Sequence, residues 1–574
     1  MTNNNNDPQV DVIISGLGPT GLTLAHLLGK RGLSVVVLER EPQFYGNARA
    51  VYTDDECLRI FQAAGMAEAL TKDMLVNATF QWLLPDGQVL HQLIQTARPY
   101  GWPANNLFYQ PLLETTLAEG LARYPHVSVR RGREFTRFVQ DADGVTVMHI
   151  ESQGAQYSKQ APVFGETPAP QEGEEALRAR YFVACDGGRS AVRAQLGIRM
   201  TGRSFPNPWI VVDIKQRDGE DCLRHLPYFS FICDPECPTV SCRQPYGHHR
   251  FEFMLMPGQT REYMEDPQTV RAYLSKYVDV DKIEILRSLV YTFNALVAER
   301  WRDGRVFLAG DAAHMTPQFV GQGMNAGVRD AYNLAWKLDA VLGGRARDSL
   351  LDSYQSERRP HAKAMIDLSI HMKNFVSTAN PLLCSLRNVA TRTARRTPGL
   401  REFLSEAKFK PRPRYEPGAY FGLPRPRHGA LEGEQLPQPQ LVDRECRARL
   451  LDEALGEGYA LIGYGVDPRQ SLSADDLQQL QRLDTRYLIL YPLGGRPQGK
   501  VAPRAPQGAE EWEDQSGECI RRFKEAGHAP GSVAVVRPDR FVFAMANPGA
   551  LQPAIGSLLQ QLGLQAANSQ REAS

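Results

Sequence analysis

Residues 10–40 read VDVIISGLGPTGLTLAHLLGKRGLSVVVLER, and this stretch decides how the fold begins. It contains an apolar run, a glycine turn, a helical pattern over about 20–30 and a second apolar run over 35–38. The glycines of the turn are Gly16, Gly18 and Gly21. The order strand, glycine turn, helix, strand predicts a βαβ unit that binds a dinucleotide.

The glycines and the end of the second strand each serve a physical purpose. Gly16 permits a tight turn, Gly18 lets the backbone approach a pyrophosphate, and Gly21 lets the helix pack close to the sheet. Glu39 follows the second strand, where a carboxylate can accept hydrogen bonds from ribose hydroxyls; Arg40, beside it, joins the same cofactor-binding set. This favours FAD or NAD over NADP. A chance glycine turn is the alternative, and the flanking strands and the acidic residue argue against it.

Composition excludes several classes of function. The 574 residues carry a formal net charge of +1, which gives no electrostatic case for nucleic acid or an anionic membrane. The first residues, MTNNNNDPQ, lack the features of a secretory leader, and no apolar run reaches the roughly 18 residues of a membrane span, so we expect a cytoplasmic protein. Cys233, Cys237 and Cys242 cluster without a second pair at zinc spacing, so we expect free thiols and no metal site.

Two polar residues before the middle of the chain are candidates for cofactor contact. Arg49 lies in a loop between small residues, where it could reach a pyrophosphate or a flavin edge; the alternative is a solvated surface arginine. Gln110 stands at the entry of a helix predicted over about 112–124, where it could meet a cofactor or cap the helix. Residues 79–93 predict a hairpin around Pro85-Asp86-Gly87.

Two further motifs follow apolar strands. Asp186-Gly187 comes after a strand predicted over 181–185, and Gly310-Asp311 comes after one predicted over 305–309. A carboxylate directly after a strand can accept hydrogen bonds from a polar ligand such as a ribityl chain.

A glycine loop before a long amphipathic helix follows the last of these motifs. We expect the helix to extend to about residue 341, and its start contains Gly323, Met324 and Asn325. Backbone N–H groups there would face a developing negative charge. The alternative for this motif and the preceding carboxylate is a helix cap with a tight turn.

The middle of the chain predicts a second sheet. Strand patterns over 209–214 and 251–256 would wall a substrate pocket. The basic residues beside them are candidates for binding an acidic substrate, although solvated side chains are the alternative: Arg243, His248, His249 and Arg250.

The last third of the chain predicts a linker and a small α/β domain. Prolines multiply beyond residue 396, which indicates a linker or extended lid. From about 437 we expect a helix over 447–455, strands over 459–462 and 487–490, a helix over 519–526 and a strand over 532–536. Residues 152–175 are polar and predict a long, mobile insertion without a packed core.

The three motifs, in this order and spacing, resemble those of the single-component (class A) flavoprotein aromatic hydroxylases. Stretches such as VACDGG, WIVVDI, LAGDAAH and HAKAMIDLS are most similar to the 3-(3-hydroxyphenyl)propionate and 3-hydroxycinnamate hydroxylases. Those enzymes form catechols with FAD, NADH and O2. The resemblance implies an FAD-binding Rossmann-like domain with an interleaved β-sheet substrate domain, and a C-terminal thioredoxin-like domain without a redox cysteine pair.

The resemblance also implies roles for single residues. The glycines, Glu39 and Arg40 would hold the ADP half of FAD, and Arg49 and Gln110 would lie near the pyrophosphate and flavin. Asp186 and Gly187, with Arg193 nearby, would serve FAD and the nicotinamide cofactor. Asp311 would bind the ribityl and pyrophosphate region, and Pro317 would lie beside the isoalloxazine. Catalytic roles fall to Pro317 and Arg49.

We therefore expect an α/β (α+β) chain with residues 1–395 as the FAD-binding domain, of which roughly 79–110 and 195–300 form the substrate part. Residues 396–436 would be the linker and 437–565 the thioredoxin-like domain. The expected partners are a small phenol, O2 and NADH, and a homodimer is a candidate oligomeric state. Two alternatives stay open: the same flavin chemistry on another phenol or a polyketide, and a non-catalytic escort protein that uses this fold for binding.

Overall fold

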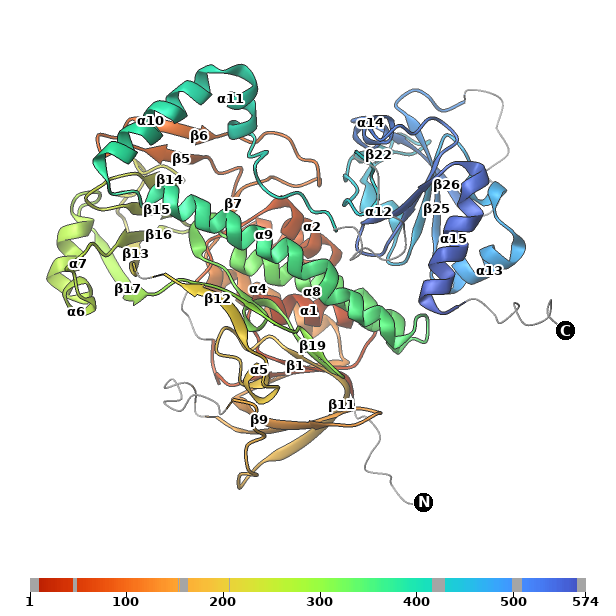
Figure 1. Ribbon diagram of the computed structural model, residues 1–574, viewed down its shortest axis with the longest axis horizontal. Coiled ribbons are helices and arrows are strands. Elements are labelled where there is room, and N and C mark those ends of the chain that lie inside the picture. Colours follow the sequence, from red (N-terminus) through yellow and green to blue (C-terminus); the bar gives the residue numbers. More distant parts are fainter. Residues whose placement is uncertain are drawn as a thin grey trace. The chain divides into compact units, whose positions relative to one another are not determined.

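A computed structural model of the chain describes residues 10–44, 49–152, 154, 164–205, 207–415, 429–497 and 508–564. The chain divides into two compact units (Figure 1). Unit 1 comprises residues 1–97, 103–331 and 362–411, and unit 2 comprises 98–102, 332–361 and 412–574. Among the helices of the described ranges, none combines the length and apolar character needed to cross a membrane.

The first sheet of unit 1 is built around the expected βαβ unit. Strand β1 (Val10–Ser15) pairs in parallel with β2 (Val35–Glu39), and α1 (Pro19–Lys30) connects them. The strand order is β19-β20-β11-β1-β2-β8, with β9 and β10 added through β11. The other strands are β8 (Val127–Arg131), β9 (Arg133–Gln140), β10 (Val145–Glu151), β11 (Glu175–Ala184), β19 (Arg302–Asp303) and β20 (Val306–Leu308).

Parallel pairing in this sheet brings three distant loops to one edge. Strands β1 and β20 both pair in parallel with β11, so the residues that follow each strand emerge at the same, carboxyl, edge. The strands are fully buried at Ile13, Val183 and Phe307, as expected for a parallel sheet covered on both faces.

The second sheet of unit 1 has the order β17-β13-β16-β15-β14-β5-β6. The expected hairpin forms from β5 (Phe80–Leu83) and β6 (Val89–Leu93), and β5 pairs in parallel with β14 (Phe229–Ile232). The other strands are β13 (Trp209–Gln216), β15 (Thr239–Arg243), β16 (His248–Met254) and β17 (Ile283–Tyr291). One face of β13 and β16 packs on α6 (Arg261–Glu265) and α7 (Pro267–Leu274).

Short elements complete unit 1. Two small sheets have the orders β12-β18-β21 and β3-β7-β4. Their strands are β3 (Tyr52–Thr53), β4 (Leu75–Val76), β7 (Asn106–Leu107), β12 (Met200–Ser204), β18 (Asn294–Ala298) and β21 (His314–Met315). The helices wholly in unit 1 are α2 (Asp55–Ala63), α3 (Ala67–Thr71), α4 (Gln110–Gly120), α5 (Ala191–Gln195), α10 (Pro381–Arg396) and α11 (Pro398–Ser405). Helices α8 (Gln322–Leu342) and α9 (Ser353–Val376) are shared, since residues 332–342 and 353–361 belong to unit 2.

Unit 2 has the thioredoxin-like arrangement that the resemblance implied. Its sheet has the order β23-β22-β26-β25-β24-β27-β28. Strand β24 pairs in parallel with β25 and antiparallel with β27, which pairs antiparallel with β28. The strands are β22 (Gln440–Val442), β23 (Ala448–Leu450), β24 (Ala460–Tyr464), β25 (Arg486–Pro492), β26 (Ala509–Asp514), β27 (Val533–Val536) and β28 (Val542–Ala546).

Alternate residues of the unit 2 strands enter two cores. Leu461 packs with α13 (Ala474–Arg482) and α15 (Pro548–Leu562), whereas Ile462 packs with α12 (Leu451–Leu455) and α14 (Glu518–Glu525). Trp336 joins the first of these cores, so the α8 segment that belongs to unit 2 is part of its interior.

A buried ionic network also joins the segments of unit 2. The Arg537 guanidinium donates to Glu357 at 2.7 Å and to Asp539, and Lys337 Nζ donates to Glu357 at 2.7 Å, all with fully buried side chains. Removing one partner from such a pair leaves an uncompensated buried charge. Residues 332–361 therefore contribute polar as well as apolar contacts to unit 2.

Three expectations for local structure differ from what is observed. The helix expected over 447–455 is helical only at Leu451–Leu455, because Ala448–Leu450 pairs with β22 as a strand. Residues 398–405, expected in the linker, form α11. Of the insertion expected over 152–175, residues 153 and 155–163 lie outside the described residues; residues 164–174 form neither helix nor strand, and Glu175 already belongs to β11.

Candidate active site

The glycine turn after β1 shows why small residues stand there. Gly16 has φ +102°, and a Cβ on it would lie 2.4 Å from the carbonyl oxygen of Cys185. A Cβ on Gly21 would lie 2.1 Å from the Gly16 oxygen, so α1 packs closely against the turn. A Cβ on Gly18 would meet nothing within 4 Å, and this glycine begins α1 without a side-chain cap. The first turn of α1 thus presents backbone N–H groups to open space, as binding of an anion requires.

Glu39 lies where the sequence predicts a ribose-binding carboxylate. Its Oε2 accepts a hydrogen bond from Leu17 N at 2.8 Å, and its Oε1 accepts one from Glu41 N at 2.9 Å. These bonds fix the carboxylate beside the glycine turn. Each oxygen keeps a further lone pair that can accept from a hydroxyl.

Asp186 lies at the carboxyl end of β11 and is buried. Its Oδ2 accepts a hydrogen bond from Val192 N at 3.4 Å, whereas Oδ1 has no hydrogen-bond partner among the described residues. Burial raises the pKa of this carboxyl. Arg193 donates to the carbonyl oxygens of Gly188 and Ala312, at 2.7 and 2.9 Å, and so ties the Asp186-Gly187 loop to the loop after β20.

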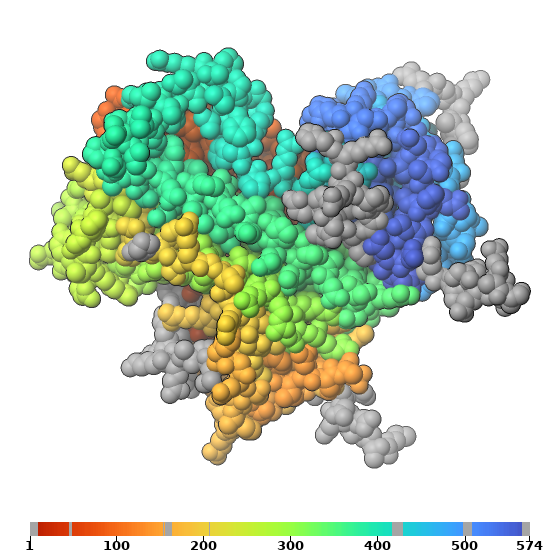
Figure 2. Space-filling view, in the orientation of Figure 1, coloured from red at the N-terminus to blue at the C-terminus, as the bar shows by residue number. Residues whose placement is uncertain are grey.

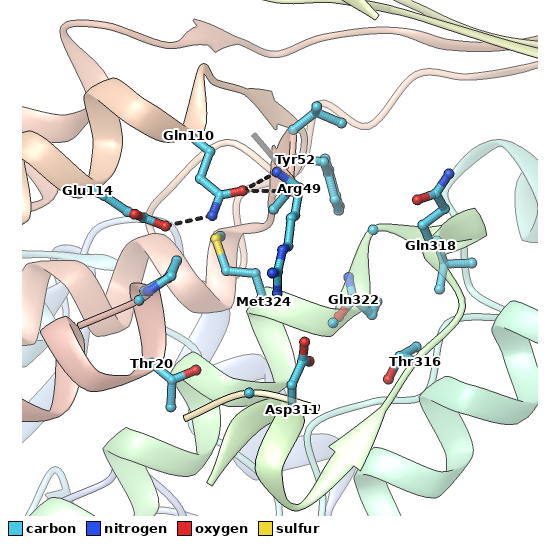
Figure 3. Close-up of a pocket in the computed structure, with 18 of the residues that line it drawn as sticks. Thr20, Arg49, Tyr52, Gln110, Glu114, Asp311, Thr316, Gln318, Gln322 and Met324 are labelled. Carbon is cyan, nitrogen blue, oxygen red and sulfur yellow. Dashed lines mark hydrogen bonds between the residues drawn. The ribbon is translucent and has the colours of Figure 1, made fainter. Parts of the chain in front are cut away.

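The side chain of Asp330, in α8, binds the loop that contains Gly310 and Asp311. The Asp330 Oδ2 accepts from Gly310 N at 3.1 Å and lies 2.7 Å from Nε2 of His314. A Cβ on Gly310 would lie 2.7 Å from Oγ1 of Thr20, so this loop packs against the start of α1. The Asp311 side chain points into the space that the loops enclose (Figure 3).

Gln110 joins the loop of Arg49 to helix α4. Its Oε1 accepts hydrogen bonds from the backbone N–H groups of Arg49 and Ala50, each at 2.6 Å, and its Nε2 donates to Glu114 Oε1 at 2.5 Å (Figure 3). Burial raises the pKa of Glu114 to about 7. Gln110 is thus a positioning residue, because it fixes the backbone from which the Arg49 side chain extends.

A single cavity of about 530 Å³ connects these groups, and all of its lining belongs to unit 1. At one end lie the glycine turn, Glu39 and the arginines of neighbouring strands. Toward the middle lie Asp186, Asp311, Gly323 and Met324. The lining includes these residues expected for the cofactor: Gly16, Gly18, Glu39, Arg40, Arg49, Gln110, Asp186, Gly187, Asp311, Gly323 and Met324.

The other end of the cavity is aromatic. Phe80 of β5 and Phe229 of β14 are stacked with ring centroids 4.5 Å apart, and Trp82 stacks on Phe231 at 5.2 Å. Tyr52 meets Phe80 edge to face at 5.2 Å. All five line the cavity, so this end offers flat apolar surfaces to a planar ring.

Ionisable groups are interspersed with the aromatic walls. Glu252 is buried, accepts from Gln318 Nε2, and has a pKa raised by burial to about 7. Asp55 lines the same region, and burial raises its pKa to about 7 as well. Carboxyl groups with pKa values near 7 can either hold or accept a proton at neutral pH.

Lys410 is a cation at the aromatic end. Its Nζ lies 2.9 Å from Asp54 Oδ2 and 3.5 Å from Glu56 Oε1, and the neighbouring Asp54 raises its pKa against the effect of burial. Arg329 donates to the same two carboxylates from α8. The ammonium group therefore stays charged where it meets the cavity.

Some expected site residues lie elsewhere. Pro317 is not part of the lining, although its neighbours Thr316 and Gln318 are, and its carbonyl oxygen accepts from Ser369 Oγ at 2.5 Å. Gly21, Gly310 and Asn325 support the lining rather than forming it; Asn325 donates to Gly321 O at 2.8 Å.

The two basic residues expected to bind substrate differ in placement. Arg250 lines the cavity but is buried and donates to Asp213 at 2.7 Å and to the Arg49 carbonyl oxygen at 2.6 Å. His248 stacks on Tyr109 at 4.0 Å and does not line the cavity. The alternative of a solvated side chain therefore does not hold for Arg250, and its role toward a substrate stays a prediction.

Sequence reasoning did not name several residues that line the cavity. Glu114 follows Gln110 by one helical turn, and this spacing could have indicated it. The others come from segments distant in sequence, and the local pattern gives no signal for them: Tyr52, Asp55, Phe80, Trp82, Phe229, Glu252, Gln318 and Lys410.

Comparison with known proteins identifies the family. Residues 9–369 match the model of the FAD binding domain family, and residues 433–561 match the HcaD C-terminal domain. A 3-(3-hydroxy-phenyl)propionate/3-hydroxycinnamic acid hydroxylase of Escherichia coli O139:H28 (strain E24377A / ETEC) is 37% identical over 556 residues, 97% of this chain and 95% of the relative. The hydroxylase of the same name from Shigella sonnei (strain Ss046) matches to the same extent. The chain belongs to the FAD-dependent aromatic hydroxylase family.

Solved structures agree on the fold of this flavoprotein. The flavin-dependent monooxygenase PieE, in complex with FAD and substrate, superposes with a TM-score of 0.77 at 21% identity, covering 97% of this chain and all of the other. The ternary complex of aklavinone-11 hydroxylase with FAD and aklavinone gives 0.72 at 22% identity and the same coverage. The resemblance drawn from the motifs is confirmed, and the flavoprotein is a monooxygenase of the hydroxylase type.

Proposed function

We propose that this flavoprotein hydroxylates 3-(3-hydroxyphenyl)propionate and 3-hydroxycinnamate at the ring carbon ortho to the phenol, using NADH and O2, in the catabolism of aromatic acids. The products would be the 2,3-dihydroxy catechols. The observation that carries this proposal is one cavity that runs from the glycine turn to an aromatic end. The names of relatives that match over 97% of the chain support the choice of substrate.

The residues present fit FAD. Gly18 leaves open space at the start of α1, Glu39 offers lone pairs, and Asp186 has an oxygen without a partner among the described residues. We assign Gly16, Gly18, Gly21, Glu39 and Arg40 to the ADP half and the remaining cofactor set to the ribityl, pyrophosphate and flavin parts: Arg49, Gln110, Asp186, Gly187, Gly310, Asp311, Gly323, Met324 and Asn325. When bound, FAD would accept a hydride from NADH and activate O2.

The chain itself must position the ring and exclude water. The stacked walls of Phe80, Phe229, Trp82 and Phe231 would hold a phenol in one plane. Arg49 would act at the flavin, and Pro317 would act from behind the lining through the loop it shares with Thr316 and Gln318. A dry, aromatic cavity would protect a reactive oxygen species from water.

The substrate's carboxylate needs a cation, and Lys410 supplies one. Arg250 lies in the cavity wall but already serves Asp213 and the Arg49 carbonyl oxygen. Lys410 also pairs with Asp54 and Glu56, but its side chain is 24% exposed, against 2% for Arg250, so its ammonium group can reach a ligand in the cavity. We therefore assign the propionate or acrylate group to Lys410.

An assay with purified protein tests this function. The protein should be yellow with bound FAD and should consume NADH when 3-(3-hydroxyphenyl)propionate is added. Resorcinol and larger polycyclic phenols, as models of polyketides, should give lower kcat/KM. Equal NADH consumption without any phenol would contradict substrate-gated reduction, and FAD without turnover on any phenol would support the escort alternative.

We also propose that the enzyme works in the cytoplasm. All nine cysteines are free thiols, which is typical of proteins in a reducing compartment. A homodimer is the oligomeric state we assign to it.

A further inference from the structure

Side chains of the second sheet form two rows across its strands on the face that lines the cavity. In the first row, Phe231 is paired with Trp82 on one side and with Val240 on the other. Val240 is paired in turn with Glu252 on β16. All four side chains line the cavity, so the row runs from the aromatic wall to a carboxyl group. The second row, two residues away along each strand, also lines the cavity and consists of Phe80, Phe229, Cys242 and Arg250.

The neighbours of Glu252 along β16 face the other side of the sheet. Phe251 and Phe253 pack in a core with Met264 of α6 and Val270 of α7. These two helices form part of the molecular surface (Figure 2). Because successive side chains of a strand point to opposite faces, Glu252 faces the cavity, and it is only 5% exposed. Glu252 is therefore a carboxyl group that a ligand in the cavity can contact and that little water reaches.

A neighbouring loop holds the Glu252 carboxyl group by one oxygen. Gln318 Nε2 donates to Oε2 of Glu252, and Gln318 lies on the loop after Thr316 (Figure 3). Among the described residues, none donates a hydrogen bond to Oε1, so this oxygen keeps its lone pairs for a ligand. The same loop leads to Gly323 and Met324, which we assign to the flavin side of the site.

The charges around Glu252 balance when it is ionised. The charged groups that face it are Arg250 on its own strand, Asp213 on β13 and Arg287 on β17, and Asp213 pairs with both arginines. Cys242 on β15 stays neutral, because burial raises the pKa of its thiol. Burial raises the pKa of Glu252 itself to about 7. A phenolate that gains the negative charge as Glu252 gains a proton would leave the charge of this group of residues unchanged.

Tyr52 and Asp55, also at the aromatic end, are less suited to accept a proton from a phenol. The single hydroxyl proton of Tyr52 lies between Ala104 O and Asn105 Oδ1, and burial raises the pKa of this tyrosine, so it stays a neutral donor. Asp55 lies in the field of Lys410, the cation that we assign to the substrate's carboxylate. Asp55 therefore belongs to the end of the cavity that holds the acid group.

Lys410 and Glu252 lie toward opposite edges of the second sheet. The chain just before Lys410 lies at the end of β6, where Ile94 N donates to Ser405 O at 3.3 Å, and β6 is next to β5. Glu252 on β16 is three strands away from β5, which is roughly 14 Å at about 4.8 Å per strand. A substrate with its carboxylate at Lys410 would therefore lay its ring on the strands between them and direct its phenol toward Glu252.

We propose, on the basis of the proposed function, that Glu252 is the catalytic residue that accepts the proton of the substrate's phenol, and that Gln318 positions it. The phenol O–H bond breaks, the proton passes to Oε1 of Glu252, and the electron pair stays on the phenolate oxygen. The phenolate raises the electron density at the ortho carbon, where hydroxylation takes place. A general base of this kind contributes roughly 100-fold or more to the rate.

A coloured phenol tests the contact without turnover. The probe is 3-(5-hydroxy-2-nitrophenyl)propionate, bound to the protein loaded with FAD in the absence of NADH, and its visible absorbance reports the phenolate. A carboxylate beside a phenol disfavours the phenolate, so Glu252→Gln should lower the pH of half-ionisation of the bound probe by about one unit. Glu284→Gln, at an exposed residue of β17, is the matched control and should titrate as the wild type does.

The pH profile of turnover tests the proton transfer. For 3-(3-hydroxyphenyl)propionate, kcat/KM of the wild type should fall about tenfold per pH unit below about pH 7, because Glu252 is then protonated. Glu252→Gln should keep its FAD, lose roughly 100-fold in kcat/KM at pH 8 and no longer show this fall, whereas Glu252→Asp should recover it.

Two results would overturn the proposal. One is a nitrophenol that does not bind or that titrates alike in the wild type and Glu252→Gln. The other is a pH profile that Glu252→Gln leaves intact and Asp55→Asn alone abolishes. The nitrophenol titration needs no turnover, so it decides on Glu252 even if the wild type hydroxylated no phenol and the proposed function failed.

Discussion

The Nε2 atom of His314 lies 2.7 Å from Oδ2 of Asp330, and both side chains are fully buried. The same Asp330 oxygen accepts a hydrogen bond from Gly310 N, directly before Asp311. The pair thus holds the turn that carries the proposed ribityl-binding carboxylate. His314 belongs to the Gly310-Asp311 motif, whereas Asp330 comes from α8.

Replacing Asp330 with alanine should loosen that turn. We expect Asp330→Ala to lower the free energy of unfolding by about 3 kcal/mol, because the variant leaves His314 and the Gly310 N–H without their buried acceptor. FAD should be lost on gel filtration. Urea denaturation and flavin absorbance measure the two effects. Asp330→Asn, which keeps an acceptor oxygen, should lose less stability and less FAD. If Asp330→Ala had the stability and flavin content of the wild type, the pair would not position the turn.

Ionisation of Glu114 should make the apoprotein less stable at high pH. Burial raises its pKa from 4.5 to about 7, so the folded state holds this proton more tightly than the unfolded state does. The tighter binding of this proton stabilises the folded state by about 3 kcal/mol. This stabilisation is fully present below pH 4.5 and is lost as the pH rises through about 7.

The Glu114→Gln variant isolates this contribution. It keeps an oxygen that can accept from Gln110 but cannot ionise. Urea unfolding at pH 5 and pH 8 should show that the wild type loses more stability than the variant between the two pH values. Identical losses would mean that Glu114 ionises at its ordinary pKa.

The sequence predicts the cofactor end of the site better than the substrate end, and the reason is topological. The glycine turn is a local pattern within 31 residues, and the motifs at Asp186 and Asp311 meet because β11 and β20 pair in parallel. The aromatic end depends on the pairing of Phe80 with Phe229 across strands that are far apart in the chain. Nothing in the neighbourhood of either residue specifies that register. Lys410 lies in a stretch predicted as a linker, and its place in the cavity could not be predicted for the same reason.

The stacked pair of Phe80 and Phe229 should set the affinity for the phenol. We expect Phe229→Leu to raise KM for 3-(3-hydroxyphenyl)propionate roughly fivefold, since an aromatic pair contributes about 1 kcal/mol beyond its area. FAD content should not change. Steady-state kinetics with parallel measurement of H2O2 should also show more NADH consumed per product. A KM equal to that of the wild type would place the phenol elsewhere.

Lys410 should discriminate substrates by their carboxylate. We expect Lys410→Met to raise KM for 3-(3-hydroxyphenyl)propionate by roughly tenfold or more, as loss of a charge-assisted hydrogen bond does. The KM for 3-propylphenol, which lacks the carboxylate, should stay the same. Lys408→Met removes an exposed lysine that pairs with Glu406 and is the control. A proportional rise for both phenols would indicate a structural role for Lys410 beside Asp54.

The most direct test of the account is the fate of O2 in a single assay. Purified enzyme with FAD, NADH and 3-(3-hydroxyphenyl)propionate should be supplied with 18O2, and the product should be analysed by mass spectrometry. The account predicts 3-(2,3-dihydroxyphenyl)propionate that carries one 18O atom, with one NADH consumed per product. Unlabelled product, or NADH oxidation that yields only H2O2, would contradict it.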